Sequence, residues 1–302
     1  MNTPQPQALI APGDKALQRA SALWPRFARH RGAVAGLAVL VLLALFAVFA
    51  DVIAAHGPAE QARSAVLAPP WWSGGTSEFM FGTDELGRDI LSRLLHGARL
   101  TLGIAVLAVL VSVLPGAALG LVAAFFPRGP GTVILRTADV LLSLPTILIA
   151  IAVVAALGSG TLNTVLAIAI GGLPAYVRLV RASALGEMAK TYVLASRMVG
   201  AGTTRLMFVT VLPNCLGPVI VAATLDFSGA ILITAGLGFL GLGAQPPAPE
   251  WGTMLASARD FIGRANWVVT LPGLAILCAA LCVNLVGDGL RDALDPRIGG
   301  PW

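Results

Sequence analysis

Long apolar stretches recur along the chain and predict helices that cross a membrane. A helix needs about 20 residues to span a bilayer core about 30 Å thick. Six stretches of roughly this length carry few or no charged side chains. They run from Gly32 to Ala50, between Arg99 and Arg128, from Thr132 to Leu157, from Thr164 to Val180, from Leu212 to Leu237 and from Trp267 to Gly287. We therefore expect an all-α integral membrane protein with six transmembrane helices.

The composition excludes water-soluble and disordered proteins. Of the 302 residues, 57% are apolar and 12% are charged, whereas about 25% of the residues in soluble domains are charged. Such a chain has too little polar surface to cover a soluble core. It also has too much Leu, Val and Ala to stay disordered.

The basic residues gather at the ends of the apolar stretches, and their distribution predicts the orientation. A net charge of +5 can indicate nucleic-acid binding, but basic residues in these places belong to a membrane protein, so we expect lipid and no nucleic acid. With an inner amino terminus, the inner segments hold 14 basic residues and the outer segments hold six. Because cytoplasmic loops are rich in Lys and Arg, we expect both termini in the cytoplasm.

The same pattern divides the chain into four parts. Residues 1–31 form a cytoplasmic tail, followed by an apolar run that is too long for a cleaved signal peptide. Residues 32–98 hold the first span and a periplasmic segment. Residues 99–290 hold the transmembrane core with an inner loop at 182–212, and residues 291–302 form a second cytoplasmic tail.

The chain lacks the motifs that would make it an enzyme. ATP hydrolysis needs a G-x-x-x-x-G-K-[ST] loop, whose backbone amides hold the phosphates. The nearest stretch has Lys190 and Thr191 but carries Ala184 and Ala189 in place of the two glycines. The three cysteines lie within apolar stretches, without histidine or carboxylate neighbours at metal-binding spacing. We expect a non-catalytic protein that itself binds no cofactor and no metal.

The inner loop between the fourth and fifth spans, from Arg181 to Leu212, is the longest and most charged inner connection. Long loops in compact proteins tend to carry function. The pattern predicts a short helix from Glu187 to Met198, ended by the glycines at 200 and 202. One side of this helix presents Tyr192, Ala195, Ser196 and Val199. This stripe either inserts into the groove of a partner protein or packs on the protein's own helices, and the sequence alone favours neither.

Two carboxylates fall within apolar stretches. Asp226 lies inside the fifth stretch, and a carboxylate in a membrane usually faces a cavity or a partner. It either lines a pathway or is a carboxylic acid hydrogen-bonded between helices. Asp139 lies near the inner boundary, three residues from Arg136, and we expect these two side chains to pair.

Charged residues also crowd the outer segment. Thr83 can cap a helix with an acidic first turn. On that helix Asp84 would pair with Arg88, and Asp89 with Arg93, at i, i+4 spacing. Helix stability accounts for these charges, and docking of an external binding protein is the alternative.

Several stretches resemble one transporter family. The run from Tyr192 to Gly202, closed by Val211–Asn214, is similar to the E-A-A-x-x-x-G loop and closing L-P of ABC importer permeases. The run from Phe81 to Arg99 resembles the G-T-D-x-x-G-R-D stretch of the dipeptide, oligopeptide and nickel branch. Phe239–Gly252 and Asn284–Arg297 match later signatures of that branch, and together the motifs resemble the second permease of each pair, the C-subunit type.

The resemblance implies a type I ABC importer permease fold in a bacterial inner membrane. It implies a second, similar permease subunit, two ATP-binding cassette subunits that use ATP and Mg²⁺, and an external substrate-binding protein. The loop helix would be the coupling helix that contacts the ATPase. The expected contacts are Tyr192, Ala195, Ser196, Gly200 and Ala201. Glu187 and Arg197 are expected to flank them as polar contacts.

This chain departs from the family pattern at three positions. Leu194 replaces the acidic residue of the loop motif and Ser196 replaces its second alanine, so a salt bridge from that acid to the ATPase is not expected. Thr234 stands where relatives often carry a glutamate before F-L-G-L-G. Asp226 lies eight residues earlier, on the same broad face, and we expect Asp226 and Thr234 along the translocation pathway.

The expected function is import of dipeptides or oligopeptides. Within the same architecture, nickel or another small solute is the alternative substrate. An ion-coupled secondary transporter would need internal repeats and interrupted helices around a midplane site, and the two halves show no convincing repeat. A scaffolding membrane subunit would not explain the long amphipathic inner loop.

Overall fold

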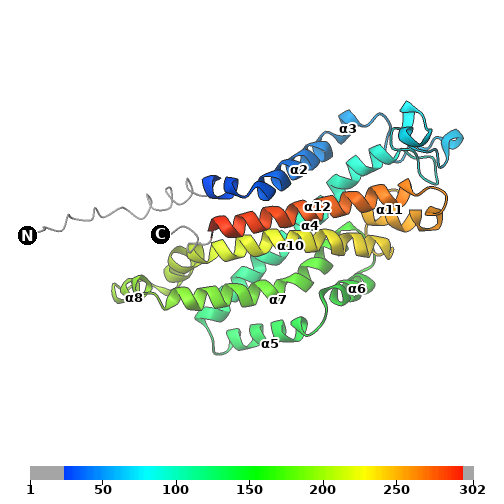
Figure 1. Cartoon of the computed structure of the whole chain (residues 1–302). Coiled ribbons are helices and arrows are strands. Elements are labelled where there is room, and N and C mark those ends of the chain that lie inside the picture. The colour runs from blue at the N-terminus through cyan, green and yellow to red at the C-terminus, as the bar shows by residue number, and fades with distance from the viewer. Residues whose placement is uncertain (1–23, 295–302) are drawn as a thin grey trace, which may run out of the picture.

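The computed structural model describes residues 24–294, which form a bundle of long helices (Figure 1). Within those residues the chain forms no β-strand beyond one isolated bridge between Thr83 and Asp89. The long helices are α2 (Arg31–Val48), α4 (Ile90–Phe125), α7 (Thr161–Met188), α10 (Leu212–Phe239) and α12 (Trp267–Leu294). The shorter helices are α3 (Ala50–Ile53), α5 (Pro130–Leu142), α6 (Thr146–Leu157), α8 (Thr191–Met198), α9 (Thr203–Arg205), the π-helix η4 (Leu206–Val211) and α11 (Trp251–Ala258).

The all-helical membrane fold expected from the sequence is confirmed, with one difference in its spans. Five described helices are long and apolar enough to cross a bilayer, and a sixth span is formed only if α5 and α6 count together. These two helices meet at a bend of 97°, so the predicted span over Thr132–Leu157 is divided into two helices. Pro145 lies at the bend, where its ring disfavours a helical conformation at Leu144.

The fourth span is longer than predicted, and this changes the inner loop. Helix α7 continues through Met188, so the predicted helix from Glu187 to Met198 is wrong in its start. Glu187 is part of α7, and the turn to α8 consists of Ala189 and Lys190. The α7 helix therefore extends beyond its apolar part and leads directly into α8.

Glycines allow the central helices to approach closely. A Cβ atom at Gly116 of α4 would lie 2.7 Å from Cβ of Tyr176 in α7, and one at Gly120 would lie 2.6 Å from the Val177 carbonyl oxygen. Such contacts leave no room for any larger side chain. On the other side of the bundle, a Cβ atom at Gly36 of α2 would lie 2.9 Å from the Cys282 carbonyl oxygen in α12.

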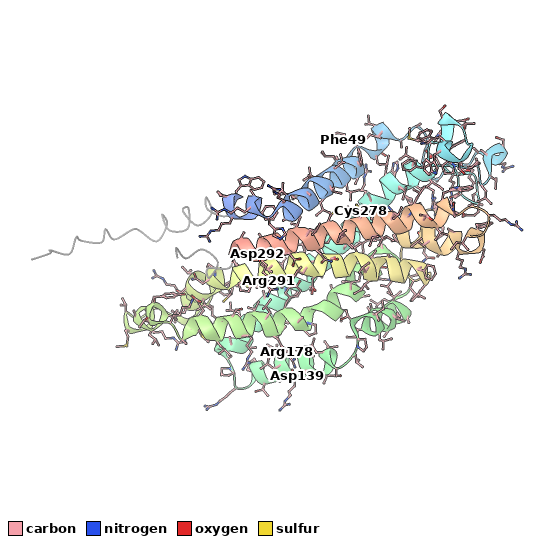
Figure 2. All side chains as sticks on the ribbon, viewed as in Figure 1. Phe49, Asp139, Arg178, Cys278, Arg291 and Asp292 are labelled. Atoms are coloured by element: carbon pink, nitrogen blue, oxygen red, sulfur yellow. The ribbon has the colours of Figure 1, made fainter. Side chains whose placement is uncertain are left out.

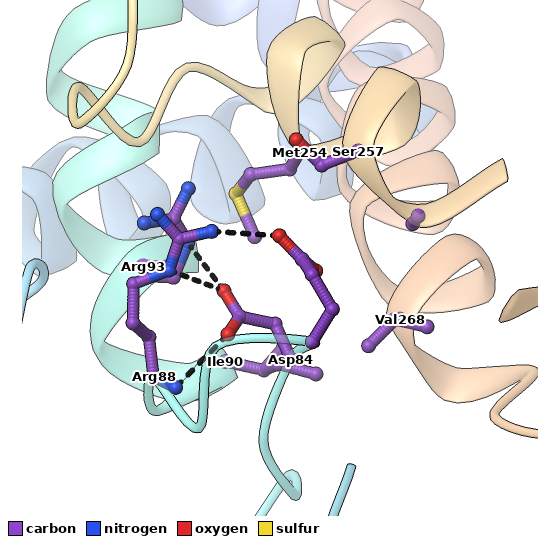
Figure 3. A pocket seen from close by; sticks show the side chains of 9 residues that line it. Asp84, Arg88, Ile90, Arg93, Met254, Ser257 and Val268 are labelled. Atoms are coloured by element: carbon purple, nitrogen blue, oxygen red, sulfur yellow. Dashed lines mark hydrogen bonds and ion pairs between the residues drawn. The ribbon is translucent and has the colours of Figure 1, made fainter. Parts of the chain in front are cut away.

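The outer segment between α3 and α4 is held by buried ion pairs, not by the helix that the sequence predicts. Arg88 Nε lies 2.6 Å from Asp84 Oδ2, and Arg93 Nε lies 3.4 Å from the same atom (Figure 3). All three side chains are buried. The expected Asp84–Arg88 pair is therefore present, but in a turn that precedes α4. Gly87 in that turn has φ +73°, which excludes a continuous helix here.

Asp89, not Thr83, caps the helix. The Asp89 carboxylate accepts hydrogen bonds from the backbone N–H groups of Leu91 (3.1 Å) and Ser92 (3.4 Å). Burial raises the pKa of the Asp89 carboxyl above its usual value, and the two hydrogen bonds offset only part of this increase. The predicted Asp89–Arg93 pair is wrong, because Arg93 turns to Asp84 and Asp89 lies 3.6 Å from His56.

A fully buried glutamate, Glu250, connects three helices at the end of the bundle that is opposite α8. Glu250 caps α11 by accepting hydrogen bonds from the N–H groups of Gly252 (2.8 Å) and Thr253 (2.8 Å), and Thr101 of α4 donates to it at 3.3 Å. Burial raises the pKa of the Glu250 carboxyl above its usual value, and these hydrogen bonds offset only part of this increase. Helix α10 touches the same group, because a Cβ atom at Gly238 would lie 2.0 Å from Glu250 Oε2.

Replacing Gly238 by Ala should destabilise the fold by about 1–3 kcal/mol, because the added methyl group overlaps the Glu250 carboxylate. The matched control is Gly236→Ala on the same helix, where a Cβ atom would meet only Ile147 Cδ1 at 3.9 Å. That change should leave stability unchanged or raise it by up to about 1 kcal/mol. Thermal unfolding in detergent measures both, and equal midpoints for the two variants would contradict this packing.

Candidate functional site

The α8 helix projects at the end of the bundle opposite the outer segment (Figure 1). Its tip is apolar and exposed: Met198 and Val199 are each 89% accessible to solvent. Tyr192, Leu194 and Ala195 are also exposed. These residues form what we call the α8 apex, Tyr192, Leu194, Ala195, Met198 and Val199. Exposed large apolar side chains gathered at one place are typical of a surface that binds another protein.

The other side of α8 packs on the protein itself. Val193 is fully buried in a cluster with Leu206, Met207 and Val211 of the following segment and Val180 of α7. The stripe of Tyr192, Ala195 and Val199 does not share this contact, and Ser196 is half-buried. Val193 therefore packs on the protein's own helices, whereas Tyr192, Ala195 and Val199 of the predicted stripe are exposed.

A polar cluster connects α8 to α7. The Glu187 carboxylate is buried at the end of α7, where it accepts a short hydrogen bond from the Tyr192 hydroxyl and lies 2.6 Å from Lys190 Nζ. Burial and the neighbouring carboxylate raise the pKa of the Tyr192 hydroxyl, so it stays protonated and donates. We call these three residues the Glu187 cluster. The sequence motif indicated Glu187 and Tyr192 as partner contacts, and it did not indicate that they bind each other.

Gly200 ends α8 in the manner that the sequence predicts. It has φ +87°, and its N–H donates to the Arg197 carbonyl (2.9 Å) while the Ala201 N–H donates to the Ser196 carbonyl (3.1 Å). This pair of bonds with a left-handed glycine is the Schellman motif. Arg197 is exposed and Ala201 is half-buried.

A cavity of about 150 Å³ lies between four segments of the bundle. It is lined by α4, α7, α10 and the bend between α5 and α6, with Asp226, Ser112 and Thr146 as its polar side chains. A Cβ atom at Gly171 of α7 would lie 2.7 Å from Thr146 Cγ2, so this glycine lets the bend approach α7. The cavity therefore lies where the one broken span meets the carboxylate of α10.

The other predicted membrane residues lie apart from this cavity. Thr234 is buried farther along α10, is absent from the cavity lining, and its hydroxyl has no hydrogen-bond partner within residues 24–294. Asp139 does not pair with Arg136, contrary to the prediction. It binds Arg178 of α7 at 2.5 Å (Figure 2), because α5 packs against α7 and brings this more distant basic side chain closer.

Two protein families match the chain. Residues 116–300 match the family described as "binding-protein-dependent transport system inner membrane component". Residues 18–70 match the "N-terminal TM domain of oligopeptide transport permease C".

Individual relatives match along nearly the whole chain. The chain is 59% identical over 276 residues to a di/tripeptide transport system permease protein of Pseudomonas aeruginosa, covering 91% of both proteins. It is 52% identical over 276 residues to a dipeptide transport system permease protein of Escherichia coli K12, covering 91% of this chain and 92% of the relative. It is 48% identical over 276 residues to the Haemophilus influenzae protein of that name, covering 91% and 94%.

The family match covers more than half of the chain, and the relatives cover nine-tenths of it. A bundle of membrane helices with an exposed inner-loop helix agrees with both. The resemblance noted in the sequence is confirmed: this chain belongs to the family of binding-protein-dependent transport system inner membrane components, the non-catalytic permease subunits of ABC importers.

Proposed function

We propose that this permease imports dipeptides or oligopeptides. The relatives described above are named for di/tripeptide and dipeptide transport, at up to 59% identity. As a permease of this family, the chain works with ATPase and binding-protein partners. We further propose that the assembly holds a second, similar permease and two ATPase subunits, that these ATPases use ATP and Mg²⁺, and that this chain binds neither.

The α8 apex is the proposed contact with an ATPase. Tyr192, Ala195 and Val199 would enter a groove of the ATPase, with Ser196, Gly200 and Ala201 at the edge of the contact and Arg197 as a flanking polar residue. Glu187 has a different place in this proposal. Its carboxylate is buried and already bound to Tyr192 and Lys190, so it would hold α8 against α7 instead of touching the partner.

The observation that carries the proposal is the direct connection between α8 and the helix that lines the cavity. Helix α7 contributes Ile168, Gly171, Gly172 and Ala175 to the cavity wall and ends at the Glu187 cluster. If the ATPase moves α8, α7 would move with it, and the α7 residues that line the cavity would be displaced. Asp226 would face the transported peptide at this cavity, and Thr234 would line the pathway in another conformation.

We also propose that both termini and α8 lie in the cytoplasm, and reporter fusions test this orientation. If the basic loops face the cytoplasm, reporters fused after Gly202 and after Trp302 should give a cytoplasmic signal. A reporter fused after Gly75 should give a periplasmic signal. A cytoplasmic signal at Gly75 would contradict the proposed orientation.

The proposed contact can be tested by placing a charge at Gly200, which directly follows the α8 apex. Gly200→Glu should weaken ATPase association at least about a hundredfold, because an unpaired charge in an interface costs about 3 kcal/mol or more. The measurement is co-purification of the ATPase, together with ATP hydrolysis stimulated by the substrate-loaded binding protein.

Two variants separate charge from strain and from general damage. Gly200→Ala keeps the site uncharged, and its only cost should be the left-handed backbone conformation, about 1–2 kcal/mol. Gly186→Glu adds the same charge in open space on α7 and should leave association unchanged. If Gly200→Glu binds the ATPase and imports substrate like the parent protein, α8 is not the coupling element.

A further inference from the structure

Asp226 and Ser112 line the cavity between α4, α7 and α10, and the Tyr176 hydroxyl lies close to the Asp226 carboxylate. We propose that Asp226, Ser112 and Tyr176 form a transient binding site for the α-ammonium group of the transported peptide. This inference rests on the proposed function, peptide import, and adds to it a recognition site within the membrane. The three residues come from α10, α4 and α7, which surround the cavity.

The two hydroxyl groups are buried and unused. Ser112 lines the cavity and is 3% exposed, Tyr176 is 1% exposed, and neither hydroxyl has a hydrogen-bond partner within residues 24–294. Buried hydroxyls are almost always hydrogen-bonded, because leaving them unpaired is costly. The Tyr176 hydroxyl lies close to the Asp226 carboxylate, so the two groups can bind one ligand together. The hydroxyl groups at this site can therefore form hydrogen bonds with a ligand.

Asp226 supplies the negative charge. It is accessible from the cavity and forms no ion pair with any basic side chain among residues 24–294. It lies near the middle of α10, and Tyr176 lies near the middle of α7, so the site is near the centre of the span. A carboxylate at this depth usually faces a pathway or a ligand.

An ammonium group fits this set of oxygen atoms. It carries a positive charge and three N–H donors, as in the side chain of lysine. The site offers one carboxylate and two hydroxyl oxygens, which together can accept all three hydrogen bonds. Calcium ions take six to eight oxygen ligands, more than these three side chains provide.

Glycines keep the site open. A Cβ atom at Gly172 would lie 2.9 Å from Ser112 Oγ, so any larger residue would press on this hydroxyl. Gly229 lies three residues after Asp226 in the same helix and lines the cavity beside it. Small residues at these two positions leave the space in which a ligand group can reach the three oxygens.

The test uses the complete transporter with its ATPases and binding protein, reconstituted in proteoliposomes and supplied with Ala-Ala. This dipeptide has only one amine, so a side-chain ammonium cannot take its place. At saturating binding protein, Asp226→Asn should lower the uptake rate about 10- to 100-fold, because the ammonium loses its charged partner. Ser112→Ala and Tyr176→Phe should each lower it a few-fold.

Ser228→Ala is the matched control. Ser228 is buried in α10, two residues from Asp226, but its hydroxyl donates to the Ala280 carbonyl at 3.1 Å, away from the cavity. Its removal should leave uptake within about twofold of the parent. If Asp226→Asn prevents assembly, Ser112→Ala and Tyr176→Phe still decide the question.

The outcomes separate the two proposals. If the parent complex does not import Ala-Ala, the proposed function fails. If the parent imports it and the Ser112, Tyr176 and Asp226 variants import it equally well, only the ammonium site fails. If Asp226→Asn lowers uptake of Lys-Ala but not of Ala-Ala, the site binds a side-chain ammonium and the proposal for the α-ammonium is overturned.

Discussion

In a bilayer core no water is available to satisfy the backbone, so each N–H and C=O group must find a partner within the protein. This constraint explains why the described spans are long helices and why their one interruption lies where it does. The break between α5 and α6 at Ser143–Pro145 opens beside the cavity, and Leu142 and Thr146 at its two edges line that cavity. An interrupted helix is tolerated at such a place because the freed groups are buried in protein or face a polar space.

Close packing then connects this cavity to the end of the bundle that holds α8. Gly116 and Gly120 bring α4 and α7 into contact, and Gly171 brings the α5–α6 bend onto α7. The same α7 helix ends at the Glu187 cluster, which holds α8. On the proposed function, α7 thus carries force in both directions, from the ATPase to the cavity and from a bound peptide to the ATPase. At the other end of the bundle, the buried Glu250 fixes the outer ends of α4, α10 and α11.

The sequence predicted what depends on local pattern and missed what depends on distant contacts. Apolar length was enough to predict the spans, and a glycine after a short helix was enough to predict the end of α8. Hydropathy could not reveal the break at Pro145, because the apolar run continues through it. The partner of Asp139 is 39 residues away in α7, and Thr101 is 149 residues from Glu250, so neither contact has a local signal. Asp84 and Arg88 pair as predicted, but Gly87 places them in a turn instead of a helix, and Arg93 pairs with Asp84 instead of Asp89.

The central claim is that the α8 apex is the contact with the ATPase. A photo-crosslinking amino acid at Val199 tests it most directly in the assembled transporter, with the same probe at Val52 as the control. Both valines are more than 80% exposed. Val52 belongs to α3 and Val199 ends α8, and these two helices lie toward opposite ends of the bundle (Figure 1). Illumination should join position 199 to an ATPase subunit and position 52 to none. A crosslink from position 52 to the ATPase, or none from position 199 in an assembly that imports substrate, would contradict the account.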